Sequence, residues 1–305
     1  MNKIPLESTL AGAYRFLFTR ILSIIGTLWL PFLATAALLA GIVWLAIPHD
    51  WLAGNFPQLS ENASPQEVLA ICLPFVKAVP LILIVSLIMG SMMYVGLMRL
   101  SLGQTKHSFA FFSLGGDVWR MALAFVLMGL LIVLLEAVLI GLFFAALAAA
   151  KAFMPQTAMI LFLVVLGIAE VCFLIYAVVR WQFFLPAVVV AEHKIGLGRS
   201  WELGGGNFWR IVVIVLLIVI PVGFVAGLVW QMTLMPVLVS EAMRMPDNPG
   251  PAEMSAFFRA LLPLAPVFLI VILVQKVATM GLMAGAIGTA YKAVTPAPEE
   301  EQASA

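Results

Sequence analysis

The sequence has few charged residues, three histidines and two cysteines, and each shortage excludes a class of protein. Charged residues make up 10% of the 305 positions, whereas a soluble domain has about a quarter. The net charge is +1, so no basic field favours binding to nucleic acid. No histidine or cysteine stands at a metal-ligand spacing, and two cysteines do not make a disulfide framework. We therefore expect no metal, no cofactor and no nucleic-acid partner.

Apolar residues are correspondingly abundant, at 64% of the chain. One soluble core cannot hide that excess, so the lipid bilayer must solvate much of the surface. Six long apolar runs occupy residues 22–47, 71–100, 119–149, 157–190, 209–240 and 260–290. Each exceeds the roughly 20 residues that a helix needs to cross the hydrocarbon layer. The runs lack the alternation of barrel strands. The sequence thus predicts an all-α, polytopic transmembrane bundle of about six spans.

The ends of the chain predict one membrane domain with a short tail. The first apolar run is too long for the apolar part of a cleaved signal peptide, so we expect it to stay as a span. We assign residues 1–295 to a single transmembrane domain. The polar residues 296–305, with three consecutive glutamates, are expected to form a disordered cytoplasmic tail.

Lysine and arginine positions predict the orientation. Positive residues gather in the cytoplasmic connections of bacterial membrane proteins. With both termini inside, the cytoplasmic segments hold eleven such residues and the outer segments hold four, with Lys276 left inside a span. We therefore expect a multi-pass protein of the bacterial inner membrane with cytoplasmic N- and C-termini.

The chain also repeats itself at a spacing of about 90–100 residues. Residues 111–120 read FFSLGGDVWR and residues 201–210 read WELGGGNFWR, and each stretch directly precedes an apolar run. This pattern predicts three tandem repeats, about 1–103, 104–191 and 192–295. Each repeat would comprise a cytoplasmic interfacial helix and two spans. The interfacial helices are expected at 5–20, 104–114 and 192–203.

The repeated stretch predicts a sharp turn followed by a helix cap. Glycines permit the turn, Asn207 can cap the next helix, and tryptophan and arginine can anchor that helix at headgroup level. A phosphate or lipid headgroup at the turn is the alternative interpretation, although Walker spacing is absent. The residues assigned to this motif are Arg199, Ser200, Gly204, Gly205, Gly206, Asn207, Trp209, Arg210, Gly115, Gly116, Asp117, Trp119 and Arg120.

The stretch from Phe184 to Arg210 resembles a bacterial family. It is similar to the YciC-type inner-membrane proteins and to the membrane domain attached to some glycerophosphoryl diester phosphodiesterases. The residues that carry this resemblance are Pro186, Glu192, Arg199, Ser200, Leu203 and Asn207. The resemblance implies the membrane fold. It implies no activity, because the chain has neither a His-Arg-Gly start nor a soluble region large enough for the phosphodiesterase barrel.

Three ionisable residues fall inside predicted spans, namely Glu136, Glu170 and Lys276. Such charges are costly in a bilayer and usually face the bundle interior with a partner. Counting at about 1.5 Å per residue places the three at similar depths, so one cluster with Gln275 beside it is possible. A proton or ion path and a structural polar clasp between repeats both remain open.

The sequence favours a non-enzymatic membrane protein with a scaffold, assembly or lipid-organising role. We find no catalytic constellation, and membrane lipids and a further protein are the partners we expect. A transporter or permease subunit that uses Glu136, Glu170 and Lys276 is the first alternative. An intramembrane lipid-modifying enzyme is the second, with candidate groups on the cytoplasmic rim at Asp117, Arg120, Glu192, His193, Arg199 and Arg210. The oligomeric state is not determined by the sequence.

Overall fold

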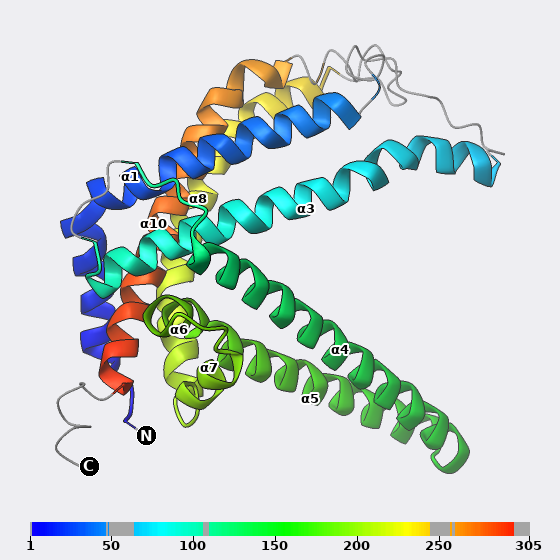
Figure 1. The fold of residues 1–305 in the computed structure, drawn as a ribbon. Coiled ribbons are helices and arrows are strands. Elements are labelled where there is room, and N and C mark those ends of the chain that lie inside the picture. The colour runs from blue at the N-terminus through cyan, green and yellow to red at the C-terminus, as the bar shows by residue number, and fades with distance from the viewer. Residues whose placement is uncertain are drawn as a thin grey trace.

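The structure is a computed structural model that describes residues 2–46, 48, 64–105, 110–244, 257 and 260–295. Within these ranges the chain forms helices, turns and no strand (Figure 1). The elements are α1 (Leu6–Ala46), α3 (Pro65–Leu102), α4 (Gly116–Phe153), α5 (Gln156–Gln182), α6 (Leu185–Glu192), α7 (Leu197–Leu203), α8 (Phe208–Ala242), the 3-10 turn η1 (Leu262–Leu264) and α10 (Ala265–Val294).

Six helical segments of the described chain are long and apolar enough to cross a membrane. They are Leu6–Ala46, Cys72–Leu102, Gly116–Phe153, Gln156–Glu192, Phe208–Ala242 and Ala265–Val294. A helix satisfies its own backbone hydrogen bonds, which is why apolar runs of this length take this form in lipid. The predicted all-helical, multi-pass membrane fold with six spans is confirmed.

The helices pack tightly at one end of the molecule and diverge toward the other (Figure 1). Most of the buried apolar side chains belong to the helix segments nearest this end, such as 89–100 of α3, 211–218 of α8 and 277–291 of α10. Beyond them α3, the α4–α5 pair, and the group formed by α1, α8 and α10 extend in different directions. The far segments expose large apolar side chains, for example Phe144 and Leu161, which lipid can solvate.

The first and last spans form a close contact through small residues. Gly285 of α10 lies so near α1 that an added Cβ would come within 2.9 Å of the Ala13 Cα and 3.0 Å of the Phe16 side chain. Membrane helices associate through such small-residue contacts because lipid offers no hydrophobic drive between them. Gly281, four residues earlier, faces Leu17 and Ile24 in the same way. The N- and C-terminal parts of the chain are thereby joined.

Two of the three expected interfacial helices differ from the prediction. The first, expected at 5–20, is helical, and α1 has a non-helical Arg20 (φ −120°, ψ 15°) where the expected helix ends. In the second, the described residues of 104–114 are not helical, since α3 runs on to Leu102 and α4 begins at Gly116. The third is wrong over its first part: α6 ends at Glu192, and α7 begins only at Leu197.

The break between α6 and α7 has a local cause. His193 adopts a left-handed backbone (φ 53°), which ends α6 and turns the chain. Prolines take two kinds of place in the spans: Pro186 lies at the start of α6 and Pro266 at the start of α10. Pro80 and Pro221 lie inside continuous helices. The predicted tail 296–305, Lys106 and His107 lie outside the described residues.

Candidate functional site

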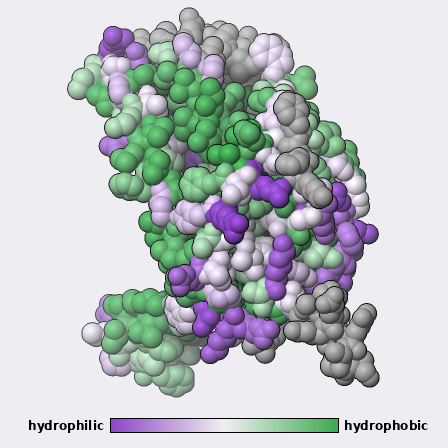
Figure 2. All heavy atoms as spheres, turned by 90° about the vertical axis from the view of Figure 1, so that its left-hand side faces the viewer, coloured by the Kyte–Doolittle hydropathy of each residue, from purple (hydrophilic) through white to green (hydrophobic). Residues whose placement is uncertain are grey.

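Polar side chains collect at the end where the helices converge, and Figure 2 faces this end. They come from α3, α4, α5, the α6–α8 region and the end of α10. We call this group the polar cap. Its members are Arg99, Asp117, Arg120, Tyr176, Arg180, Glu192, His193, Lys194, Arg199, Ser200, Trp201, Asn207, Arg210 and Tyr291.

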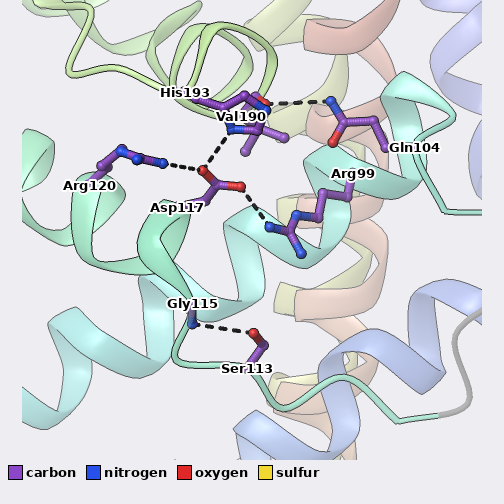
Figure 3. A network of polar contacts seen from close by, with 8 residues as sticks. All are labelled: Arg99, Gln104, Ser113, Gly115, Asp117, Arg120, Val190 and His193. Carbon is purple, nitrogen blue, oxygen red and sulfur yellow. Dashed lines mark hydrogen bonds and ion pairs between the residues drawn. The ribbon is translucent and has the colours of Figure 1, made fainter.

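Asp117 is the centre of the cap (Figure 3). Only 4% of the residue is exposed, and three cationic or ring nitrogens surround its carboxylate. Arg99 Nη2 donates to Oδ2 at 2.6 Å, and Arg120 Nη1 donates to Oδ1 at 2.9 Å. His193 Nδ1 also lies 2.9 Å from Oδ1. Hydrogen bonds to an ionised acceptor are the strong ones, so Asp117 holds three separate segments together.

The local sequence explains how Asp117 reaches these partners. It is the second residue of α4, where a carboxylate is favoured by the positive end of the helix dipole. Arg99 lies in the last turn of α3, and Arg120 lies one turn along α4. His193 is brought from the third predicted repeat by its left-handed turn after α6. Nearby, Gln104 Nε2 donates to the Val190 carbonyl at 3.5 Å, which adds a second link to α6 (Figure 3).

Glu192 forms a second charged centre next to His193. Lys194 Nζ lies 2.8 Å from its carboxylate, and Arg199 Nε lies 3.5 Å from it. The Tyr291 hydroxyl donates to the same carboxylate at 3.0 Å. Glu192 thus links the end of α6 to the end of α10, which are 99 positions apart in sequence.

Ser200 and Arg180 fix the break between α5 and α6. Pro186 has no backbone N–H, and residues 183–184 form a turn between α5 and α6, so carbonyl groups near the end of α5 lose their helical donors. The Ser200 hydroxyl donates to the Trp181 carbonyl at 2.6 Å. Arg180 stacks on the Trp201 ring at 4.0 Å and donates to the Trp201 carbonyl at 2.7 Å. The serine therefore has a structural hydrogen bond.

Asn207 stands at the cap position of α8 but does not cap it with its side chain, so that prediction was wrong. Its Oδ1 instead accepts from the Ile4 backbone N–H at 3.0 Å, and its Nδ2 donates to the Asn2 carbonyl at 3.3 Å. Arg210 donates to the Ile4 carbonyl. The buried Asn207 satisfies backbone groups of the N-terminal segment rather than those of its own helix.

The glycines of the motif do not act alike. Gly206 takes a left-handed backbone (φ 70°), as the predicted turn requires. Gly204 lies against the backbone of Arg180, where an added Cβ would be 3.3 Å from its carbonyl oxygen. Gly115 has an extended backbone (φ −65°, ψ 170°) and Gly116 begins α4, so this second pair needs no special conformation. Trp119 and Trp209 are both more than half exposed, as headgroup anchors would be.

The structure does not bring the three intramembrane charges together. Glu136 and Lys276 are exposed, and Glu170 is half-buried. α10 packs mainly against α1, α3 and α8, whereas α4 packs against α5, α3 and α6. None of the ion pairs among the described residues includes Glu136, Glu170 or Lys276. Gln275 accepts a hydrogen bond from Trp230 Nε1 at 3.4 Å, within the α8–α10 pair.

A small cavity of about 210 Å³ lies between the helices next to the polar cap. It is lined by residues of α3, α4, α5, α6, α8 and α10, among them Tyr94, Phe125, Gln182 and Pro186. It therefore marks the place where all three predicted repeats meet. Its lining is largely apolar, with the Tyr94 phenol and the Gln182 amide as its polar side chains.

The cap contains many charged side chains, yet most of their hydrogen bonds and ion pairs are with other residues of this chain. Asp117, Glu192, Ser200 and Asn207 each have their side-chain oxygens engaged by this chain. His193 is more open than these four residues, because its side chain is 59% exposed and only Nδ1 contacts Asp117. Among the described residues no group of three histidine, cysteine or acidic side chains could hold a metal.

Several cap residues are absent from the set that the sequence singled out as its motif. Arg99, Arg180 and Tyr291 lie at helix ends far apart in sequence, so no local pattern joins them. Their positions in the last turns of helices, near other charged residues, were the only sequence signal that could have assigned them to the cap. No family model, curated protein or solved structure matches the chain.

Proposed function

We propose that this multi-pass membrane protein is a non-enzymatic, lipid-organising scaffold of the bacterial inner membrane, with its polar cap in the cytoplasm. The observation that carries the proposal is that the polar side chains of the cap bond to other segments of the same chain. Asp117, Glu192, Ser200 and Asn207 direct their side chains to other segments of this chain, and so lock the helix ends together. The far parts of the spans diverge and present apolar surface, which membrane lipid can cover.

The family resemblance supports this proposal through the same residues. Pro186 begins α6 next to the helix break, Ser200 bonds the end of α5, and Leu203 is buried. Residues that specify how helices join would be retained in a scaffold whatever its partner. We accordingly infer relationship to the YciC-type proteins at the level of fold.

The proposed repeats are supported by the matched use of two buried polar residues. Asp117 and Asn207 occupy equivalent places in the repeated stretch and each lies at the start of a span. Asp117 contacts Arg99 of the first repeat and His193 of the third. Asn207 contacts the Ile4 backbone of the first repeat. Each residue therefore joins its own repeat to another, as expected for units that cannot stand alone.

Orientation is tested by labelling single cysteines from outside the cell. The background variant lacks Cys72 and Cys172, which are exposed and unpaired. Lys194→Cys marks the polar cap, and Arg244→Cys marks the opposite end of α8; their side chains are 62% and 75% exposed. A membrane-impermeant maleimide should label residue 244 in intact spheroplasts and residue 194 only after lysis. The reverse pattern would contradict a cytoplasmic cap.

The contact between Asp117 and His193 favours one second candidate, a lipid-modifying enzyme at the membrane rim. A buried carboxylate that holds Nδ1 of an exposed imidazole leaves Nε2 free, as a general base requires. Two arginines already share this carboxylate, which fits an architectural role equally well. The transporter alternative has less support, because Glu136, Glu170 and Lys276 do not meet.

Lipid analysis separates the two candidates. Membranes are compared from cells that lack the protein, express it, or express His193→Gln, with folding checked by thermal stability in detergent. The scaffold proposal expects no lipid species whose conversion depends on His193. A lipid product that appears with the wild-type chain and disappears with a folded His193→Gln variant would overturn it.

Partners are sought by crosslinking in native membranes and purification through a C-terminal tag. Recovery of a stoichiometric protein would define a scaffold for that assembly. Recovery of the chain with a constant set of lipids would define a lipid organiser. Recovery with neither a constant protein nor a constant lipid composition would contradict both forms of the proposal.

A further inference from the structure

A groove on the side of the bundle remains outside the polar cap. It has a volume of about 460 Å³ and is lined by residues of α1, α8 and α10. On α8 the lining residues Val222, Val225, Ala226 and Val229 follow the spacing of a single helix face. All three helices are among the candidate spans, so the groove lies in the part of the molecule that contacts the bilayer.

We propose that this groove binds one acyl chain of a membrane phospholipid, whose phosphate lies near Tyr14 and Arg15 of α1. The proposal rests on, and deepens, the lipid-organising role by assigning it a site. Tyr14 and Gln275 are the polar side chains of the lining, and the rest of the surface is apolar. Gln275 lies partway along the α10 lining and is hydrogen-bonded to Trp230, so the polar end of the groove is the one at Tyr14, with Arg15 beside it. A groove with one polar end matches the chemistry of a lipid tail joined to its head group.

The length and cross-section of the groove favour an acyl chain over a helix as its occupant. Its α10 lining extends from Ile270 to Leu282, which at about 1.5 Å per residue gives a length of roughly 18 Å. A volume of about 460 Å³ over that length corresponds to a cross-section on the order of 25 Å². A helix of about 10 Å diameter needs roughly 80 Å². A polymethylene chain whose carbons lie about 4 Å from their neighbours needs roughly 20 Å².

The charge at one end orients the lipid. Tyr14 lies on the first part of α1, six positions before the non-helical Arg20. Arg15 is exposed and follows Tyr14 directly. Tyrosine and arginine at the membrane surface favour the headgroup layer, and a guanidinium pairs with phosphate geometrically. The other end of the groove, at Val229 and Ile270, lies further along α8 and further back along α10, toward the diverging ends of the helices.

The test uses the full chain in nanodiscs that contain phosphatidylglycerol with a diazirine in its acyl chain. Ala278 lies in the groove and is half-buried, so Ala278→Phe should fill the space. The matched control is Ala145→Phe, which makes the same change at an exposed position of α4 outside the groove. Peptides that contain residues 221–229 and 270–282 are quantified by mass spectrometry after irradiation, and thermal stability confirms folding of both variants.

The expected result is that Ala278→Phe lowers labelling of the groove peptides at least fivefold, while Ala145→Phe leaves it unchanged. Arg15→Gln should weaken retention of phosphatidylglycerol several-fold but not that of a diacylglycerol with the same chains. Groove labelling that is unaffected by Ala278→Phe would overturn the acyl-chain site. Equal effects of Arg15→Gln on both lipids would overturn the phosphate assignment.

These outcomes are separate from those of the proposed function. If labelling persists elsewhere on the chain but not in the groove, the site is wrong and lipid organisation is untouched. If a lipid product depends on His193 while the groove is still labelled, the non-enzymatic proposal fails and the acyl-chain site stands.

Discussion

Replacing Asp117 by asparagine should destabilise the protein more than any comparable change at its polar end. The substitution keeps the shape of the side chain but removes its charge, and it can place an amide N–H group opposite guanidinium donors. Three charge-assisted hydrogen bonds at about 1.5–3 kcal/mol each would sum to about 4.5–9 kcal/mol if they were independent. They are not, because Arg99 and Arg120 are 30% and 44% exposed and water can solvate them after the change.

We therefore expect the free energy of unfolding to fall by about 2–4 kcal/mol in Asp117→Asn. The assay is unfolding by SDS in mixed micelles, followed by tryptophan fluorescence, since Trp181 and Trp201 are in contact near the cap at 5.1 Å. The control is Glu202→Gln, which removes a carboxylate that is 60% exposed and whose Arg199 partner lies 3.4 Å away. That change should cost less than about 1 kcal/mol.

A double-mutant cycle makes the reasoning refutable. Combining Asp117→Asn with Arg99→Met should give a loss smaller than the sum of the single losses by at least about 1 kcal/mol, because the two side chains share one contact. Additive losses, or a loss for Asp117→Asn no greater than that for Glu202→Gln, would show that the buried carboxylate does not hold the helix ends together.

Three further experiments test other parts of the fold. Gly285→Ala should lower thermal stability in detergent through a clash with the α1 backbone worth about 1–3 kcal/mol, whereas Gly129→Ala, with nothing within 4 Å, should not; equal effects would exclude the close helix contact. Ser200→Ala should cost about 1–3 kcal/mol in the same SDS titration, because it leaves a carbonyl without its donor, and an unchanged midpoint would contradict that role. Lys276→Met and Glu170→Gln should show additive effects within about 0.5 kcal/mol, since they are not paired; partial rescue would restore the intramembrane cluster as a hypothesis.

The local rules that act on the sequence explain which predictions succeeded. Apolar runs longer than the bilayer thickness must be helical in lipid, so the six spans follow from composition alone. The position of Gly206 in its turn follows from steric rules on a single residue. Helix ends were less predictable, because an amphipathic pattern over 192–203 does not reveal that His193 turns the chain.

Contacts between residues far apart in the chain could not be predicted from the sequence. Asn207 reads locally as a cap, but it bonds the Ile4 backbone 203 positions away, a contact that only the folded bundle provides. Similar depth along two spans does not make their residues neighbours, which is why Glu136 and Lys276 remain apart. His193 and Asp117 were both candidate groups on the predicted cytoplasmic rim, but no sequence pattern paired them; the left-handed turn after α6 brings them into contact.

The sequence by itself determined that this chain is an all-helical, six-span membrane protein, because burial in lipid is decided by the length and apolarity of each segment. Tertiary structure alone decided which polar residues meet, because helices choose neighbours through shape and close packing, as at Gly285. It joined Asp117 of α4 to α3 and to the turn after α6, and it left the groove between α1, α8 and α10 open.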